Sequence, residues 1–194
     1  ANPAGIACDG CGFINASRAT LTTGTPLLSE GVLQGFRVQG GALEIEGQGL
    51  DARGTDYAAL LARAIRVNAT IRADQLAVVT GAGEVPAQDP LTPATPLTPL
   101  AGAGPAPRLQ LDVAALGGIY ARKIFLVGTE AGLGMVHVGR AVADDDLVLR
   151  SDGWLVQSGV LQAGKDLQVT ARSLDHRGGA LSASRIQIDT PGGT

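Results

Sequence analysis

The chain has few of the side chains on which nucleic-acid, metal and redox sites depend. Its 194 residues include three Phe, two Tyr, one Trp, two Cys and two His, and the formal net charge is −3. A phosphate-binding surface needs clustered positive charge, and a base-stacking surface needs aromatic rings. Two cysteines cannot complete a four-cysteine zinc site, and two histidines exclude most imidazole sites. We therefore expect no nucleic-acid partner, no metal and no cofactor.

Long apolar runs are also missing. No stretch approaches the ~18 apolar residues of a membrane-spanning helix, so we expect no membrane span. The first residues, Ala1–Gly5, lack the basic start and apolar centre of a signal peptide, which is typical of a mature form or a fragment. Glycine is abundant, with 28 residues, and hydrophobic residues make up 45% of the chain. That composition and length are enough for one core or one elongated module.

Short strand-like segments recur along the chain. They share a small residue at the first position, Leu or Ile at the third, Ala at the fifth and apolar residues near the end. The copies are Gly12–Leu21, Ala69–Val78, Gly117–Leu126, Gly159–Val169 and Gly179–Ile188. Equivalent positions, such as Leu147 and Leu167, lie about 20 residues apart. Units of this size predict a solenoid in which each unit buries its apolar face on the next.

A right-handed parallel β-helix is the solenoid that these units favour. Each unit holds two or three apolar runs too short for a helix, and it lacks the ladder asparagine of a leucine-rich repeat. Alternate residues such as Ile186 and Ile188 fall on one face of a strand, so the interleaved polar residues point outward. We predict an all-β fold with coils of about 20 residues.

Two segments depart from this pattern. Gly81–Pro107 carries seven of the ten prolines, and from this composition we expect no ladder strands and a surface excursion. Residues 56–64 contain helix-forming side chains after Thr55 and Asp56, either of which is a suitable helix cap. This second segment predicts either one short helix or the extension of a coil.

The N-terminal stretch carries a specific resemblance. Asn2-Pro3-Ala4-Gly5-Ile6 precedes Cys8-Asp-Gly-Cys11, and the run continues to Gly24. This pattern resembles the secretion domain of filamentous haemagglutinin-like exoproteins, the passengers of two-partner secretion. The likeness continues through Gly49–Arg53 and Leu116–Ala121 into the repeats, so it covers essentially the whole chain.

The resemblance implies a right-handed β-helix that a dedicated outer-membrane transporter recognises and exports. The protein would be secreted through the periplasm to the bacterial cell surface. Residues 1–126 would be the C-terminal part of the secretion domain (the haemagglutinin activity domain), and residues 127–194 the first haemagglutinin-type repeats. Because the family's upstream motif is absent and the chain stops at Pro191–Thr194, we expect a fragment whose open ends associate end to end.

The family motif linked to folding and secretion maps onto Asn2, Pro3, Gly5 and Ile6, while Ala4 departs from the commoner Asn. The residues by themselves predict a turn, because Asn and Pro initiate turns and Gly accepts a positive φ. The turn and the secretion signal are compatible interpretations.

Cys8 and Cys11 leave several states open: a redox pair, half of a zinc site, buried free thiols or a disulfide. A redox pair needs a helix N-terminus after the first cysteine, whereas glycines and a strand follow here. Zinc would need two more ligands, and His137 and His176 are distant in the sequence. The oxidising periplasm that the resemblance implies favours a disulfide.

No other cluster makes a good catalytic candidate. The three carboxylates of Asp144–Asp146 are consecutive, so they diverge on a strand, whereas a calcium site needs converging oxygens. The side chains of Asp175–Arg177 diverge in the same way, and no Gly-x-Ser-x-Gly elbow is present. We expect Trp154 and Met135 to fill the core or a corner. The positive charges of four further residues are scattered and form no patch: Arg66, Arg72, Arg122 and Lys123.

The sequence therefore predicts a non-enzymatic part of a large secreted adhesin or haemagglutinin exoprotein. It would serve secretion, form a β-helical stalk and meet host-cell or neighbouring-cell receptors. One alternative is the same module in a contact-dependent inhibition toxin or a cytolysin. A more distant alternative is a β-helix polysaccharide lyase.

Overall fold

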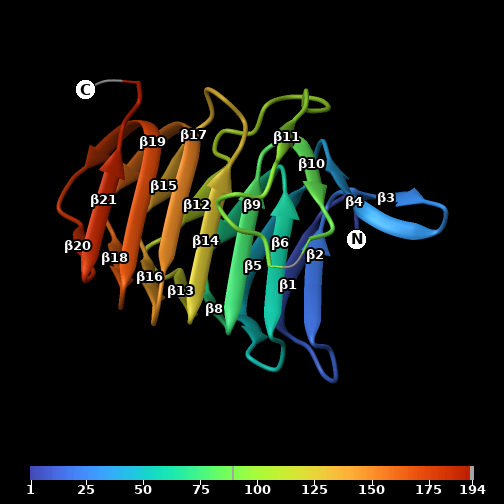
Figure 1. The fold of residues 1–194 in the computed structure, drawn as a ribbon, viewed down its shortest axis with the longest axis horizontal. Helices are drawn as coiled ribbons and strands as arrows, with labels where there is room; N and C mark the ends of the chain where they lie inside the picture. The colour runs from blue at the N-terminus through green and yellow to red at the C-terminus, as the bar shows by residue number, and fades with distance from the viewer. Residues whose placement is uncertain (89, 193–194) are drawn as a thin grey trace.

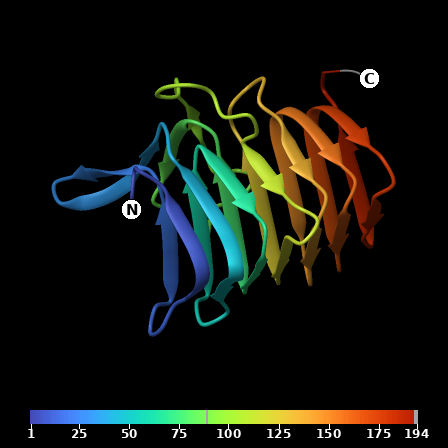
Figure 2. The same ribbon diagram turned by 180° about the vertical axis from the view of Figure 1, so that it is seen from behind.

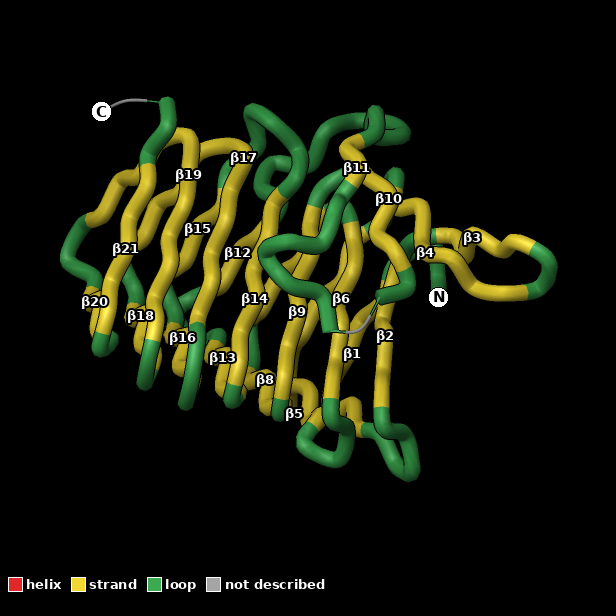
Figure 3. Tube along the Cα trace, in the orientation of Figure 1, coloured by secondary structure: helices red, strands yellow, loops and turns green. Residues whose placement is uncertain are grey.

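In a computed structural model that describes residues 1–88 and 90–192, the chain winds into a solenoid of parallel strands (Figure 1). The described residues form strands and loops and no helix (Figure 3). Seventeen strands build one continuous sheet that follows the coils, and four build a second, antiparallel sheet. Within the described ranges, no helix is long and apolar enough to cross a membrane.

Each coil has three faces, which we number I to III in chain order. Face I consists of the first parts of β1 (Ile6–Gly12) and β5 (Ala42–Ala52), then β7 (Ala64–Val67), β12 (Leu111–Val113), β15 (Met135–His137) and the last parts of β17 (Leu147–Gln157) and β19 (Asp166–His176). Face II consists of the ends of β1 and β5, then β8 (Thr70–Ala73), β13 (Gly118–Ala121), β16 (Arg140–Ala143), β18 (Val160–Ala163) and β20 (Ala180–Ser182). Face III consists of β2 (Arg18–Thr22), β6 (Tyr57–Ala62), β9 (Gln75–Thr80), β14 (Lys123–Gly128), the first parts of β17 and β19, and β21 (Arg185–Asp189).

Rows of apolar side chains fill the interior and stack from one coil to the next. On face II, for example, Leu50 pairs with Ile71, and Ile71 pairs with Ile119. All three are buried in one continuous core. Successive residues of a strand point to opposite sides, so every second residue joins such a row. Each buried Leu or Ile contributes roughly 1.5–3 kcal/mol, and the rows therefore hold neighbouring coils together.

The predicted β-helix is confirmed, and so is the spacing of its coils. Leu147 pairs with Leu167, and Leu167 pairs with Ile186. The predicted alignment of Gly12–Leu21 is wrong in its first half, however. Cys11 rather than Ile14 takes the face II position beside Leu50, and Ile14 is 89% exposed. The reason is a loop at residues 13–17, after which β2 returns to the expected register.

The second sheet covers the outer side of face III over the first coils. It consists of β3 (Thr25–Ser29), β4 (Val32–Val38), β10 (Gly83–Pro86) and β11 (Thr98–Pro99), in the order β11-β10-β4-β3. Val38 and Val85 of this sheet pack with Tyr57, Leu61 and Phe125 in a second hydrophobic core. The β3–β4 hairpin projects away from the solenoid, as the view from behind also shows (Figure 2).

The expectation that Gly81–Pro107 has no ladder strands is therefore wrong in part. β10 pairs with β4, and β11 pairs with β10. Pro86 and Pro99 stand at the ends of their strands, where a missing N–H removes little of the ladder. The rest of the segment is irregular, as predicted for an excursion (Figure 3). Asp89 of this segment lies outside the described residues, and so do residues 193–194 at the end of the chain.

Of the two options for residues 56–64, the extension of a coil is confirmed and the helix is wrong. β6 is buried on both sides because Ala58 and Leu60 face the main core while Tyr57 and Leu61 face the second one. A strand covered on both sides carries a continuous apolar run instead of an alternating one. Such a run lacks the period by which a strand is recognised.

Candidate functional site at the first coil

Residues Asn2 to Gly5 form a turn at the N-terminal edge of the first coil. The Gly5 N–H donates to the Asn2 carbonyl at 3.1 Å, and the Ala4 N–H donates to the Asn2 side-chain Oδ1 at 3.2 Å. Gly5 has a φ of +129°, which glycine adopts without strain. The four residues before Gly5 are exposed, and Ile6 pairs with Leu43 as β1 begins. The turn is thus accessible to a partner while its end is fixed in the coil.

The body of the solenoid holds this turn from below. The Asn2 N–H donates to the Thr22 carbonyl at 2.8 Å. The Thr23 hydroxyl, buried below it, donates to the Gly40 carbonyl at 2.8 Å. Gly41 has a φ of +76°, and a Cβ there would lie 2.8 Å from the Pro3 carbonyl oxygen and 2.7 Å from the Thr23 Cβ. Sequence reasoning missed Thr23 and Gly41, whose role depends on contacts between segments that are distant in the chain.

Cys8 and Cys11 lie on either side of the corner between faces I and II in the first coil. Cys8 is fully buried and pairs with Ile45, whereas Cys11 is half-buried and pairs with Leu50. Their sulfur atoms lie within bonding distance, and their Cα atoms are 5.5 Å apart. The disulfide and the role of Asn2, Pro3, Gly5 and Ile6 in secretion stay predictions.

The triple aspartate, Asp144–Asp146, takes part in a row of ion pairs along one corner. Asp145 contacts Lys165 of the next coil at 2.7 Å and Arg122 of the preceding coil at 3.4 Å. Arg122 in turn contacts Asp74 at 2.9 Å. Hydrogen bonds from Lys165 lower the pKa of Asp145, and those from Arg122 lower the pKa of Asp74. In the described part of the chain, no group of three or more acidic, Cys or His side chains is placed to hold a metal.

The other motif with catalytic residue types is dispersed. Arg177 contacts Asp175 at 2.6 Å in an exposed pair. His176 is exposed, at the face I position beside Gln157. His137 is buried at the same position in the coil before Gln157, and its Nδ1 lies 2.8 Å from the Gln157 Oε1. This row of side chains contains no convergent nucleophile and base.

Of the expected fillers, Met135 is buried in the core as predicted, and Trp154 lies 36% exposed at a corner. Three of the four scattered cations, Arg66, Arg122 and Lys123, form ion pairs. Arg66 contacts Glu44 at 2.8 Å, and Lys123 contacts Asp146 at 3.4 Å.

A buried ion pair that sequence reasoning missed fixes the Pro-rich segment to the solenoid. The Arg63 Nη2 lies 2.7 Å from the Glu130 Oε1, and the two side chains are only 7% and 17% exposed. Arg63 also donates through Nη1 to the carbonyls of Ala103 and Pro105 at 2.9 and 3.1 Å. The hydrogen bonds from Arg63 lower the pKa of Glu130. The two residues are too distant in the sequence for a motif to connect them.

Known proteins resemble this chain in both sequence and structure. It is 44% identical over 182 residues to the "Toxin CdiA" of Yersinia pestis, a match that covers 93% of this chain and 5% of that protein. It is 45% identical over 166 residues to the "tRNA nuclease CdiA" of Escherichia coli strain STEC_O31, covering 84% of this chain and again 5% of the relative. The chain thus spans about one twentieth of the length of these relatives.

The structural comparison agrees with the fold described above. The crystal structure of a filamentous hemagglutinin secretion domain superimposes with a TM-score of 0.71 and 29% sequence identity, covering all of this chain and 63% of that one. The family model of the TPS secretion domain, where TPS stands for two-partner secretion, matches residues 1–168. The chain therefore belongs to the TPS secretion domain family.

Proposed function

We propose that this chain is the module by which a large exoprotein is recognised and exported by its partner outer-membrane transporter. The observation that carries the proposal is the exposed Asn2–Gly5 turn, which is fixed to the first coil of a TPS secretion domain. A signal read by another protein must be accessible, and it binds at a lower cost in ordering when its conformation is already defined. The exposed side chains satisfy the first condition, and the contacts with Thr22 and Gly41 satisfy the second.

The role is a structural and recognition role, without catalysis. The coil interior is mainly apolar, and ion pairs on its outside join neighbouring coils. Folding of the remaining coils one after another suits such a module, because each completed coil offers a strand edge to the next. We keep residues 1–126 as the secretion part and residues 127–194 as the first repeats of the stalk, although the strand β14 continues across that boundary.

A crosslinking pull-down with outer-membrane transporters of two-partner systems tests the proposal. We expect the wild-type chain to crosslink a transporter. We expect Asn2→Ala and Gly5→Ala to lower the yield at least fivefold, because they remove the side-chain acceptor and the positive-φ residue of the turn. Asn15→Gly is the matched control on an exposed loop of the same coil, since Gly keeps the φ of +55° there.

Gly41 packs against the turn from the body of the solenoid, so a substitution there tests the turn independently. Gly41→Ala brings a methyl group against Pro3 and Thr23, whereas Gly31→Ala has an equally positive φ of +79° and nothing within 4 Å of the new Cβ. We expect only Gly41→Ala to lower transporter crosslinking. Absence of wild-type crosslinking with every transporter would refute the function. Wild-type yields for all turn variants would refute the role of the motif.

The relatives favour contact-dependent inhibition as the activity of the whole exoprotein, ahead of adhesion. Several are named CdiA, among them a "16S rRNA endonuclease CdiA" of Enterobacter cloacae at 41% identity over 185 residues. We infer that a chain containing this module would act on neighbouring bacterial cells. Competition between a producing strain and a target strain lacking immunity tests this, and undiminished target survival would favour an adhesin.

A further inference from the structure

A row of alternating charges crosses four coils at the corner between faces II and III. This corner row consists of Asp74, Arg122, Asp145 and Lys165. The four positions are equivalent, because the N–H of each later member donates to the carbonyl of the member before it, at 2.7–2.8 Å. Arg122 lies 2.9 Å from Asp74 and 3.4 Å from Asp145, and Asp145 lies 2.7 Å from Lys165. Neighbours in the corner row therefore carry opposite charges.

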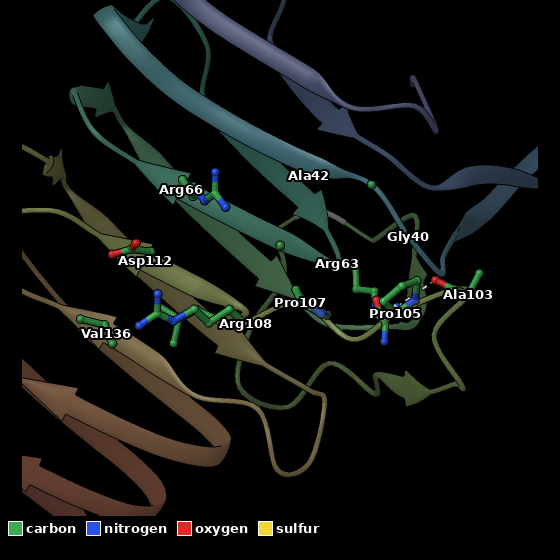
Figure 4. Close-up of a pocket in the computed structure, with 13 residues that line it drawn as sticks. Gly40, Ala42, Arg63, Arg66, Ala103, Pro105, Pro107, Arg108, Asp112 and Val136 are labelled. Atoms are coloured by element: carbon green, nitrogen blue, oxygen red, sulfur yellow. Dashed lines mark hydrogen bonds between the residues drawn. The ribbon is translucent and has the colours of Figure 1, made fainter.

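The same order of charges occurs on the outer side of face I in the earlier coils. Glu44 pairs with Arg66, at 2.8 Å between the side chains, and Arg66 pairs with Asp112. Figure 4 shows Arg66 and Asp112 on neighbouring strands. Opposite charges thus accompany the pairing of coils on two sides of the solenoid.

The apolar core, by contrast, does not select the coil of residues 139–158 over the next coil, residues 159–178. In the face II row, Ala141 of the first coil lies between Ile119 and Leu161. Leu161 in place of Ala141 would cover more apolar surface of Ile119, because its side chain is larger. Two further equivalent positions hold the same residue in both coils: Ala143 and Ala163, Leu147 and Leu167.

We propose that the corner row selects which coil stacks on which, and that Asp145 keeps residues 139–158 between their proper neighbours. If residues 159–178 stacked directly on the coil of Arg122, Lys165 would face Arg122. Both ion pairs of Asp145 would then be lost. The contact of Lys123 with Asp146 would be replaced by one with Asp166, the equivalent residue of the next coil. The misplaced stack therefore exchanges three attractive contacts for one attractive and one repulsive contact.

This selection acts while the chain folds. The native solenoid has one coil more than the misplaced stack, so it buries more apolar surface once it is complete. The competition arises earlier, when the edge of the Arg122 coil is free and either of two similar coils can add to it. The longer loop of the misplaced stack gives little protection, because closure entropy grows slowly with loop length.

Two introduced cysteines report the misplaced stack. Tyr120 and Gln162 each pair with Val142, from opposite sides, so they lie two coils apart. Adjacent strands are about 4.8 Å apart, so two coils separate these Cα atoms by about 10 Å, which is too far for a disulfide. Tyr120→Cys with Gln162→Cys therefore links only in the misplaced stack. Tyr120→Cys with Val142→Cys links in the native one.

Refolding from urea under mild oxidation, followed by peptide mapping, measures both links. Asp145→Lys with Lys165→Asp keeps the net charge but places a cation beside Arg122 in the native stack and an anion there in the misplaced one. We expect this swap to raise the misplaced link about threefold or more over the chain with the native corner row. Arg150→Asp with Asp152→Arg is the matched control, because it swaps a pair 3.3 Å apart within the same coil. We expect it to leave the misplaced link unchanged.

Salt distinguishes charge selection from a general loss of stability. Raising NaCl from about 50 mM to about 1 M screens exposed charges, so the excess of the misplaced link in the swapped chain should fall. Equal yields in the swapped chain and the control would overturn the proposal, and so would an excess that salt does not reduce. If the swapped chain forms neither link, Asp145→Asn replaces it, and a misplaced yield no higher than that of Asp152→Asn would overturn the proposal.

Discussion

His137 places a titratable ring in a row that is otherwise apolar in the preceding coils. Val67 and Val113 occupy the same position in the two coils before it, and Gln157 follows in the next coil. The ring is 1% exposed, with Nδ1 on the Gln157 side chain and Nε2 without a partner among the described residues. Burial lowers the pKa of His137 from 6.5 to about 4, because the charged ring would lose its hydration.

The first prediction is a loss of stability in weak acid. The folded pKa lies below the unfolded value, so the unfolded chain binds the extra proton between pH 6.5 and about 4. The contribution of His137 is therefore complete above pH 6.5 and declines as the pH falls, by about 3 kcal/mol in total. Urea unfolding at a series of pH values measures it.

Two variants separate this effect from other titrations. His137→Val continues the valine row and should remove the decline, although Gln157 then loses a partner at a cost of about 1–2 kcal/mol at pH 7. His176→Gln changes an exposed histidine and should leave the decline unchanged. An identical decline in His137→Val would contradict the assignment.

At the residue scale, the sequence predicts the Asn2–Gly5 turn but not the residues that hold it in place. Asn2, Pro3 and Gly5 carry local turn preferences that can be read without a fold. Thr23 and Gly41 act through contacts with segments that are distant in the sequence. A row such as His137 and Gln157 can be read only after the coil register is known.

At the scale of elements, the Pro-rich segment is the part of the chain that depends most on side-chain contacts. Its strands β10 and β11 have four and two residues, and residues 100–110 are irregular. Arg63 and Glu130 hold it, with the Glu130 Oε2 also accepting the Ala82 N–H at 3.2 Å. Tyr57 adds a further tie, because its hydroxyl accepts the Leu91 N–H at 3.1 Å.

The second prediction concerns that ion pair. Glu130→Gln leaves Arg63 with an uncompensated and largely buried charge, so we expect a loss of about 3 kcal/mol and faster proteolysis within residues 99–107. Glu84→Gln, in the exposed pair with Arg37, should cost no more than about 1 kcal/mol. Equal losses for the two variants would show that the buried pair has no special role.

The pH dependence of the same pair has a defined sign. The folded pKa of Glu130 is lowered by the hydrogen bonds from Arg63, so its contribution is complete above the unfolded value of 4.5 and is lost as the pH falls through the folded pKa. Glu130→Gln should flatten the stability curve below pH 4.5.

Whether an element could be predicted depended on what covers it. Strands with one face in the core and one in solvent, such as β18 with Leu161 and Ala163 inward, show the alternation that the repeat template captured. β6 lies between the main core and the second sheet, and its outer Ala59 and Leu61 erase the alternation. The coil Gly139–Leu149 departs from the template at the third position, where Ala141 pairs with Ile119 and Leu161 of the neighbouring coils.

On the scale of the whole molecule, each coil packs mainly on the coil before it and the coil after it. β17 pairs with β14 and β19, and β19 pairs with β21. Stability in such an array is the sum of local terms between neighbours. The last coil contributes little to this sum, because its Ile186 and Ile188 are 43% and 44% exposed.

The third prediction follows from that additivity. Ending the chain after Arg177 removes β20 and β21, and we expect the remaining coils to stay folded with a Tm only a few degrees lower. Hydrogen exchange should lose protection in β19 and keep it in β6 and β9. Ending the chain after Gln157 also removes the buried Leu161 and Leu167, so it should cost more. If the chain that ends after Arg177 unfolds in every coil, the additive description is wrong.

The β3–β4 hairpin and the Pro-rich segment build the second sheet, and they also set the order in which coils can close. Leu21 meets Leu60 only after the β3–β4 hairpin and β5 have been placed, whereas Leu149 meets Val169 across a loop about half as long. Closure entropy grows slowly with loop length, by about 0.6 kcal/mol per doubling, and contacts distant in sequence slow folding further. The first coils should therefore form slowly and the later coils quickly. A chain that folds from its N-terminal end would start with its slowest step and continue with faster ones.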